Sequence, residues 1–225
     1  MPHLPMNDSE IEVVWQCDCA LAINKPYGVA TQAPAGIDSV ETQLIRQLSR
    51  HGEYLTFPHR LDRAVSGVLL VALTKRAARL LSGQFATRKT AKHYVAVVEG
   101  IVETDNQADV RWEDQLLKLP GKPQTQVVPP NTEGAKQAIT DVRVLDQYPD
   151  EDRTRLALRP LTGRMHQLRV QCASRGTPIV GDQLYGASQS IQTDIGERIL
   201  LHAEKLEFHN PSTGRRETAI APCPF

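Results

Sequence analysis

The chain has 225 residues, a formal net charge of zero and an apolar fraction of 40%. A chain of this length can bury a full core as one domain, and no apolar run approaches the roughly 20 residues that a membrane-spanning helix needs. The N-terminus lacks the basic and apolar regions of a secretory signal. We therefore expect residues 1–10 to be a disordered lead-in and residues 11–225 to form one domain.

The four cysteines do not form the pattern of a disulfide framework. Cys17 and Cys19 would share one face of a strand, whereas Cys172 and Cys223 are far away in sequence. Because no second Cys/His pair completes a zinc spacing, the sequence predicts buried free thiols and no metal site. Free thiols indicate a reducing compartment, and hence a cytoplasmic protein.

Charge is unevenly distributed along the neutral chain. The segment from Arg60 to Lys92 holds eight basic residues and a single acid, Asp62, and the segment from Arg153 to Arg175 holds six arginines and no acid. Two such blocks predict a cationic cleft. A lone carboxylate in a cationic field stays ionised and suits a nucleophile or an electrostatic stabiliser. The alternative is a structural salt bridge or a turn-capping Asp.

Hydrophobic patterns predict the elements of the first hundred residues. A capping-box spacing at 38–41 opens a helix, and the continuous apolar run at 68–73 is typical of a strand covered on both faces. The basic amphipathic helix after it should turn Leu80, Leu81 and Phe85 inward. The expected elements are strands at 11–15 and 20–24, a fixed turn at 25–28, a helix ended by His51–Gly52, a strand at 68–73, a helix at 76–88 and a strand at 92–100.

The second half of the chain is less regular. Residues 101–134 hold four prolines and many polar residues, and they predict an excursion of loops and small strands. Two alternatives for this segment are an insertion over the cleft and a surface excursion. The elements expected after it are strands at 138–145 and 155–158, a helix at 165–174 with Thr162 as N-cap, a short strand at 178–182 and a closing hairpin of 199–208 and 217–221. This mixture predicts an α+β fold with a mixed, mostly antiparallel central sheet flanked by helices around a cleft.

Two further segments could carry chemistry. Tyr94, in Lys92-His93-Tyr94, could stack on a flat base, although a half-buried strand tyrosine is an equal alternative. If the chain is helical from Met165 onward, His166 and Arg169 share a face; the alternative is an exposed amphipathic helix. No phosphate-binding glycine loop, nucleophile elbow or His-Glu-x-x-His motif occurs. The sequence therefore gives no support for a nucleotide cofactor or for catalytic zinc.

Four blocks of the sequence together resemble the RluA-type family of pseudouridine synthases, in a compact form without an S4-like RNA-binding domain. In the order of the family, these blocks are Asn24–Gly28, His59–Asp62 with Ser66-Gly67, Lys92–Tyr94 and Gly163–Arg169. The segments Gly181–Gly186 and Leu201–Ala203 match as well. Val65 and Gln171 depart from the family pattern, which usually has Thr and often His at these positions.

The resemblance implies a uridine-to-pseudouridine isomerase acting on structured RNA, a tRNA or rRNA stem-loop, without a cofactor. The N1–C1′ bond breaks and a C5–C1′ bond forms. The resemblance assigns Asp62 as the nucleophile, Tyr94 as the residue that stacks on uracil and moves a proton, and Arg169 as the partner of Asp62. It places Arg60 in the gap left by the flipped nucleotide. The further residues expected to contact RNA are His59, Arg164, His166, Lys25 and Leu201.

Two alternatives to this enzyme remain at the level of sequence. One is a non-catalytic RNA-binding protein on the same fold, which would not need the carboxylate of Asp62. The other is a hydrolase of the N-glycosidic bond, a chemistry that normally uses a second carboxylate. We also expect a monomer and, because the net charge is zero, a shallow salt dependence of RNA binding.

Overall fold

The computed structural model of the chain describes residues 10–103, 109–194 and 196–225. The expected lead-in, apart from residue 10, lies outside the described residues. The helices are α1 (Val40–Gln47), α2 (Lys75–Ala86), α3 (Gln167–Ala173) and the 3-10 turns η1 (Pro149–Glu151) and η2 (Gln183–Tyr185). None of the helices in the described part is long and apolar enough to cross a membrane.

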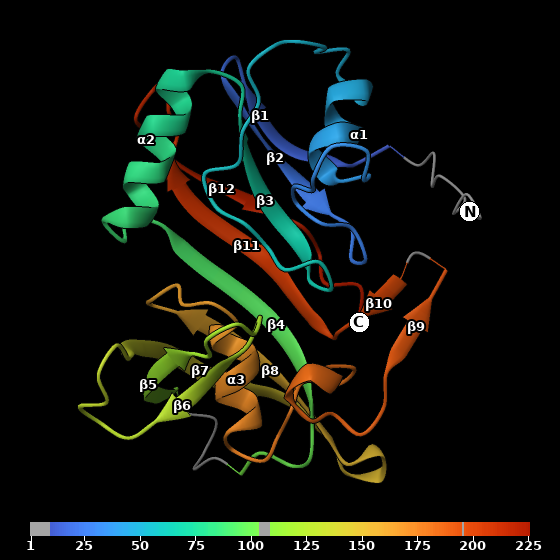
Figure 1. Ribbon diagram of the computed structural model, residues 1–225, viewed down its shortest axis with the longest axis vertical. Helices are drawn as coiled ribbons and strands as arrows, with labels where there is room; N and C mark the ends of the chain where they lie inside the picture. Colours follow the sequence, from blue (N-terminus) through green and yellow to red (C-terminus); the bar gives the residue numbers. More distant parts are fainter. Residues whose placement is uncertain (1–9, 104–108, 195) are drawn as a thin grey trace.

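Ten strands form one sheet in the order β1-β2-β3-β11-β4-β8-β7-β5-β6, with β12 paired to β11 (Figure 1). Neighbours are antiparallel except β3 and β11, which run parallel. This confirms the predicted α+β fold with a mostly antiparallel sheet. The strands are β1 (Val13–Cys17), β2 (Ala20–Lys25), β3 (Ser66–Ala72), β4 (Ala91–Glu99), β5 (Val110–Lys118), β6 (Thr125–Val128), β7 (Lys136–Tyr148), β8 (Arg153–Pro160), β11 (Leu201–His209), β12 (Arg216–Ile220) and the separate pair β9 (Ile191–Thr193) and β10 (Gly196–Arg198).

Helices cover both faces of the sheet. Leu69 and Val71 of β3 belong to the core cluster that contains buried residues of α1 and α3, whereas Val68 and Leu70 pack with α2. All seven residues of β3 are buried, as expected for a strand covered on both sides. Asp62 lies just before β3, so its loop leads into a strand that is buried throughout.

The predicted excursion at 101–134 is corrected in part, and its residues 104–108 lie outside the described residues. Its described part contains β5 and β6, which extend the main sheet at one edge. β5 is nine residues long, and its buried side carries Trp112 and Leu116 with the half-buried Asp114 between them. A carboxylate on the inward face breaks the apolar alternation from which a strand is predicted, so the sequence pattern did not show its length.

Two helix details also differ from the prediction. The N-cap of α1 is Ser39, and its capping-box partner is Thr42 rather than Glu41: the backbone N–H of each residue donates to the hydroxyl of the other. In α2, Leu81 is fully buried but Leu80 is 39% exposed. Alanines fill the inward face beside Leu81, which turns Leu80 toward solvent.

β3 and β11 approach each other closely at Gly67, which has φ +113°. A Cβ at this position would overlap the backbone of Ala203 in β11. Only glycine therefore allows this parallel pairing, which joins residues 66–67 to residues 202–203. The pairing also places Leu201, at the start of β11, beside the loop that carries Asp62.

Candidate active site

The loop that carries Asp62 is held by the turn at Lys25–Gly28. Arg63 Nε donates to the carbonyl oxygen of Gly28 at 2.7 Å, and the Gly28 N–H donates back to the Arg63 carbonyl at 2.8 Å. Lys25 is fully buried, and burial lowers its pKa to about 7. Its ammonium donates at 2.7, 2.8 and 3.3 Å to the carbonyl oxygens of Pro26, Val29 and Arg63. The predicted RNA contact of Lys25 is therefore wrong: this side chain fixes the loop from inside.

His59 also supports the loop. Its ring stacks on Phe85 with 4.4 Å between centroids, and its Nε2 accepts a hydrogen bond from the Leu70 N–H at 3.0 Å. Burial, with a smaller contribution from Lys92, lowers the pKa of His59 to about 3. The ring is thus neutral at physiological pH, and it lines the larger of the two cavities described below.

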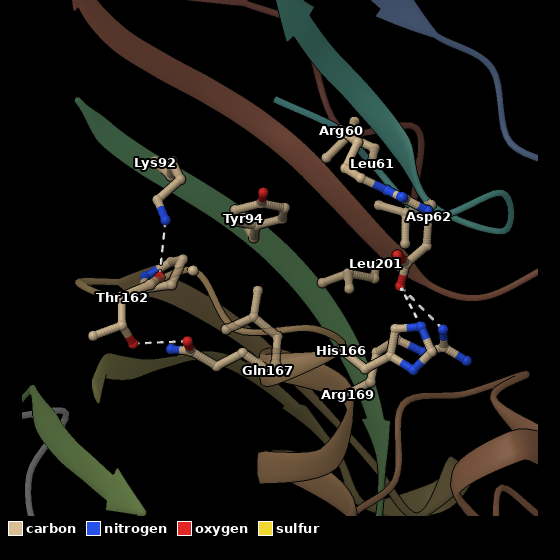
Figure 2. Close-up of a pocket in the computed structure, with 14 residues that line it drawn as sticks. Arg60, Leu61, Asp62, Lys92, Tyr94, Thr162, His166, Gln167, Arg169 and Leu201 are labelled. Carbon is tan, nitrogen blue, oxygen red and sulfur yellow. Dashed lines mark hydrogen bonds and ion pairs between the residues drawn. The ribbon is translucent and has the colours of Figure 1, made fainter. Parts of the chain in front are cut away.

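Arg169 lies between the carboxylates of Asp62 and Asp182. Its Nη1 donates to Asp62 Oδ2 at 3.1 Å (Figure 2). Its Nε and Nη2 donate to Asp182 at 2.6 and 2.7 Å. Burial lowers the pKa of Arg169, but the hydrogen bonds and charges of Asp182 and Asp62 raise it further, so the net shift is upward. His166 Nε2 lies 3.5 Å from the same oxygen of Asp62. The structure therefore brings Asp62, His166 and Arg169 together. The resemblance implied the contact of Asp62 with Arg169, whereas the contact of His166 with Asp62 was not expected.

The predicted N-cap of α3, Thr162, is wrong. The N-cap is His166, which adopts the left-handed conformation at φ 53°, and the helix begins at Gln167. This turn directs the His166 ring toward Asp62, while its Nδ1 shares a hydrogen bond of 2.9 Å with the Tyr185 hydroxyl. Burial lowers the pKa of His166 and Asp62 partly opposes that shift. His166 is therefore mostly neutral at physiological pH.

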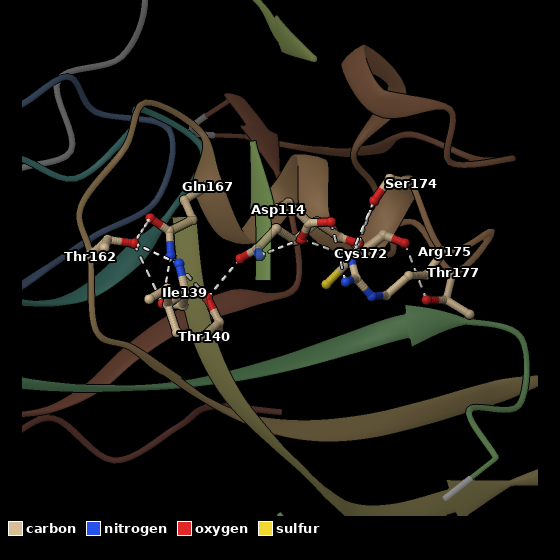
Figure 3. Close-up of polar contacts among 10 residues, drawn as sticks. Asp114, Ile139, Thr140, Thr162, Gln167, Cys172, Ser174, Arg175 and Thr177 are labelled. Carbon is tan, nitrogen blue, oxygen red and sulfur yellow. Dashed lines mark hydrogen bonds and ion pairs between the residues drawn. The ribbon is translucent and has the colours of Figure 1, made fainter. Parts of the chain in front are cut away.

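The hydroxyl of Thr162 belongs instead to a polar network along α3 (Figure 3). It shares a hydrogen bond of 2.7 Å with Gln167 Oε1, and Gln167 Nε2 donates to Thr140 at 2.9 Å. Thr140 then donates to Gln171 at 2.6 Å, and Gln171 donates to Asp114 at 2.6 Å. Gln171, one of the departures from the family pattern, thus fixes α3 against β5 and β7.

Asp62, His166 and Arg169 line a cavity of about 100 Å³. Tyr94 of β4 lies between Lys92 on one side and the group of Asp62, His166 and Arg169 on the other (Figure 2). Burial and the charge of Asp62 raise the pKa of Tyr94, so its phenol stays protonated. Leu201, which is expected to contact RNA, is 4% exposed and lines the cavity wall.

A second cavity, of about 460 Å³, shares five lining residues with the first. None of the described residues that line it is acidic, whereas Arg60, Arg88, Lys92 and Arg164 are all basic. Arg60 is exposed and lines both cavities, and Arg164 Nε donates to the Gln137 carbonyl at 3.0 Å. The two cavities form one cleft, cationic over its larger part, with the carboxylate of Asp62 at its inner end.

Sequence reasoning missed three residues of this site. Lys92 lines both cavities, and its burial, together with the charge of Arg88, lowers its pKa to about 8. Asp182 accepts a hydrogen bond from Arg169. Tyr185 lies against the Arg169 guanidinium and shares a hydrogen bond with His166. All three lie within blocks that match the family pattern. A motif does not show which way each of its side chains points, so the position of these three residues in the site could not be predicted.

Comparison with known proteins shows which family the chain resembles. The family model described as RNA pseudouridylate synthase matches residues 20–174. The chain is 34% identical to the dual-specificity RNA pseudouridine synthase RluA of Escherichia coli K12, with 98% of this chain and 97% of that protein covered. It is 33% identical to the tRNA pseudouridine synthase C of Pasteurella multocida, with 94% and 90% covered.

A solved structure is also similar. Human RNA pseudouridylate synthase domain containing 1 superposes with a TM-score of 0.77 at 27% identity, covering 96% of this chain and 84% of that one. The family model spans more than half of the sequence, and the relatives align over nearly all of it. The chain therefore belongs to the RNA pseudouridylate synthase family, among its RluA-type members, and is an isomerase that acts on RNA.

Proposed function

We propose that Asp62 is the nucleophile of the isomerisation, with Arg169 as its orienting partner and Tyr94 as the platform for the uracil. The observation that carries this proposal is the position of the Asp62 carboxylate, at the inner end of a cationic cleft and 3.1 Å from Arg169 Nη1. Its side chain keeps 29% exposure, so one face stays open to a substrate while Arg169 fixes the other.

The chemistry follows from these positions. Asp62 attacks an electron-poor carbon of the target nucleotide, the N1–C1′ bond breaks, and its electron pair stays on N1 of the uracil. The uracil turns within the cavity, C5 bonds to C1′, and the bond to Asp62 breaks. The hydrogen at C5 leaves as a proton, for which the carboxylate of Asp62 and the neutral ring of His166 are acceptors. Tyr94, whose phenol stays protonated, serves as a stacking surface and a donor.

The target uridine has to leave its stack to reach this cavity. Unstacking costs a few kcal/mol, and a side chain that replaces the base offsets part of that cost. Arg60 is the candidate for this role because it is exposed and lines both cavities. The basic residues of the larger cavity then suit the phosphates that flank the target.

We propose a tRNA or rRNA stem-loop as the substrate and a monomer of one catalytic domain as the active form. The similarity to a tRNA pseudouridine synthase supports an RNA of this kind. A cytoplasmic location is part of the same proposal, and the four free thiols support it.

The test is release of tritium from 5-³H-uridine-labelled RNA, measured separately on transfer and ribosomal fractions. Forming the C5–C1′ bond expels the C5 hydrogen, so release reports the isomerisation itself. Asp62→Asn should fold, bind RNA and release no tritium. Turnover retained in this folded variant would overturn the role of Asp62, and RNA binding by the wild type without release from either fraction would favour a non-catalytic binder.

A further inference from the structure

A groove of about 630 Å³ lies beside α2, outside the cleft. One wall is α2 with the residues that follow it, and the other is the turn between β11 and β12. The first wall contributes Arg76, Leu80 and Lys89, and the second contributes the segment Asn210–Gly214. None of the described residues that line the groove is acidic. The groove therefore offers positive charge to an anionic partner.

The positive charge of α2 is not neutralised by the rest of the protein. No acidic residue occurs between Asp62 and Glu99. Several other exposed arginines pair with carboxylates, as Arg143 does with Asp109 at 2.7 Å. The basic residues of α2 and its exit are all exposed and form no ion pair within the described part of the chain: Lys75, Arg76, Arg79, Arg88 and Lys89.

The positions of these charges do not serve the helix itself. Lys75 and Arg76 are the first two residues of α2, whose first turn contains no acid. The N-terminal end of a helix carries a partial positive charge, so basic side chains there are unfavourable. α1 follows the usual pattern, with Glu41 in its first turn and Arg46 in its last. A charge arrangement that opposes local stability is expected where the residues serve a function.

The end of α2 borders both the groove and the cleft. Arg88 adopts the left-handed conformation at φ 56°, which is uncommon for a residue other than glycine. The Lys89 N–H then donates to the Gln84 carbonyl at 2.8 Å and closes the helix. These two consecutive residues line different cavities, Arg88 the larger cavity of the cleft and Lys89 the groove. Positive charge is therefore continuous from the cleft to the groove.

Both walls of the groove are fixed within the protein. α2 lies at the C-terminal end of β11 (Figure 1), where the Gln84 side chain donates to the His209 carbonyl at 2.8 Å and accepts from the His209 N–H at 2.7 Å. In the turn, Asn210 Oδ1 accepts from the backbone N–H groups of Ser212 at 2.8 Å and Thr213 at 3.3 Å. A site that is formed in advance loses little conformational entropy when a partner binds.

We propose that this groove binds the phosphate backbone of the substrate RNA beyond the stem-loop that occupies the cleft. The inference rests on the proposed substrate, a stem-loop within a longer RNA. Phosphate contacts fix the position of an RNA without reading its sequence. The groove therefore adds affinity for RNAs whose stem extends past the cleft, and it contributes nothing to an RNA confined to the cleft.

The test is filter binding of two synthetic RNA hairpins that share one uridine-containing loop. One stem has about 5 base pairs, and the other has about 20, more than the roughly 16 that a double-stranded RNA-binding domain spans. We expect the wild type to bind the long hairpin about tenfold more tightly, because charge-assisted contacts to Arg76 and Lys89 are added. The slope of log K against log salt should be steeper by about 1.4 to 1.8 for the long hairpin.

Arg76→Gln with Lys89→Gln is the groove variant, and it should remove most of the difference between the hairpins while binding the short hairpin like the wild type. Its melting temperature should stay close to that of the wild type, because these two changes at opposite ends of α2 have opposite effects on the helix dipole. Arg46→Gln with Arg143→Gln is the matched control. It removes the same charge from exposed arginines outside the cleft and the groove, and it should keep the full difference.

Equal affinity of the wild type for the two hairpins would overturn the proposal. So would a groove variant that loses affinity for both hairpins alike, or a control variant that loses as much as the groove variant, since each indicates a general effect of charge. Tritium release by Asp62→Asn is measured beside them. Turnover in that variant would defeat the proposed role of Asp62 and leave the hairpin comparison standing. An inactive Asp62→Asn beside a groove variant with an unchanged hairpin difference would defeat only this inference.

Discussion

The Lys92 ammonium donates to the carbonyl oxygen of Thr162 at 2.9 Å, which ties β4 to the loop before α3 where the two cavities meet. Burial and the charge of Arg88 lower the pKa of Lys92 to about 8, so it carries its charge below pH 8 and loses it above. We expect KM for RNA to rise as pH increases from 7 to 9. In Lys92→Gln, KM should be about tenfold higher at pH 7 and nearly flat over this range, because a charge-assisted contact is worth roughly 1.5 kcal/mol or more. Parallel KM profiles in the two proteins would show that Lys92 does not contact the substrate.

The same lysine makes a prediction about stability. Its folded pKa, about 8, is below the ordinary value of 10.5, so the unfolded chain binds more protons between these pH values. The free energy of unfolding should therefore gain a contribution that rises from pH 8 to pH 10.5. Urea unfolding at several pH values measures it, and the difference between wild type and Lys92→Gln isolates Lys92 from the buried Lys25. A difference that falls with pH would refute the assignment.

The salt dependence of RNA binding should match the basic residues of the cleft. Four cations line the larger cavity, and each released counterion contributes a slope of about −0.7 to −0.9 in log K against log salt. We expect a slope of roughly −3 to −4, which is shallow for an RNA-binding protein, as the zero net charge predicts. Arg88→Gln with Arg164→Gln should reduce its magnitude by about 1.5 to 2 in filter-binding assays. Arg46→Gln, on α1 outside the cleft, should leave it unchanged.

Replacing Arg169 should destabilise the fold as well as abolish activity. Arg169→Ala leaves Asp182 as an unpaired carboxylate in a buried site, and we expect a loss of about 3–5 kcal/mol in the free energy of unfolding. Arg175→Ala is the control, because it removes an arginine from the same helix and from the carboxylate of Asp114, but at a more exposed position. That change should cost about 1 kcal/mol or less. Equal losses in the two variants, measured by urea unfolding, would contradict the buried pairing of Asp182.

The glycine at the centre of the sheet gives a stability prediction without any charge. Gly67→Ala adds a Cβ that overlaps the Ala203 backbone at a φ that L-residues rarely adopt. We expect a loss of at least about 2 kcal/mol and lower activity, since Leu201 lies on the strand that would have to move. Gly83→Ala, inside α2 with nothing within 4 Å of the added Cβ, should be neutral or stabilising by up to about 1 kcal/mol. Thermal unfolding compares the two.

The sequence predicted those parts of the site in which local pattern and function coincide. The loop of Asp62 precedes an apolar run that forms a strand buried throughout, and Arg169 meets Asp62 as expected. Lys25 could not be placed in this way. A lysine in a motif resembles a phosphate contact, and only the folded chain shows three carbonyl oxygens around its ammonium.

Other differences arise where tertiary contacts override local preference. Thr162 is of a residue type favoured at N-caps, but its hydroxyl forms hydrogen bonds with Gln167 and the backbone of Ile139. His166, in the left-handed conformation, is the N-cap instead. Asp114 interrupts the apolar–polar alternation along β5, because its carboxylate points inward and binds Gln171 and Arg175. Each of these contacts joins residues that are distant in sequence or depends on an unusual backbone angle, and periodicity reports neither.

The order of strands at the centre of the sheet also constrains when the enzyme can become active. β3 and β4 follow each other in the chain and are complete by residue 99, yet β11, which begins at residue 201, lies between them (Figure 1). Until that strand has been synthesised, the loop with Asp62 and the sheet half with Tyr94 and α3 lack their common neighbour. A nascent chain on the ribosome therefore has no assembled cleft, and RNA modification begins only after β11 has inserted.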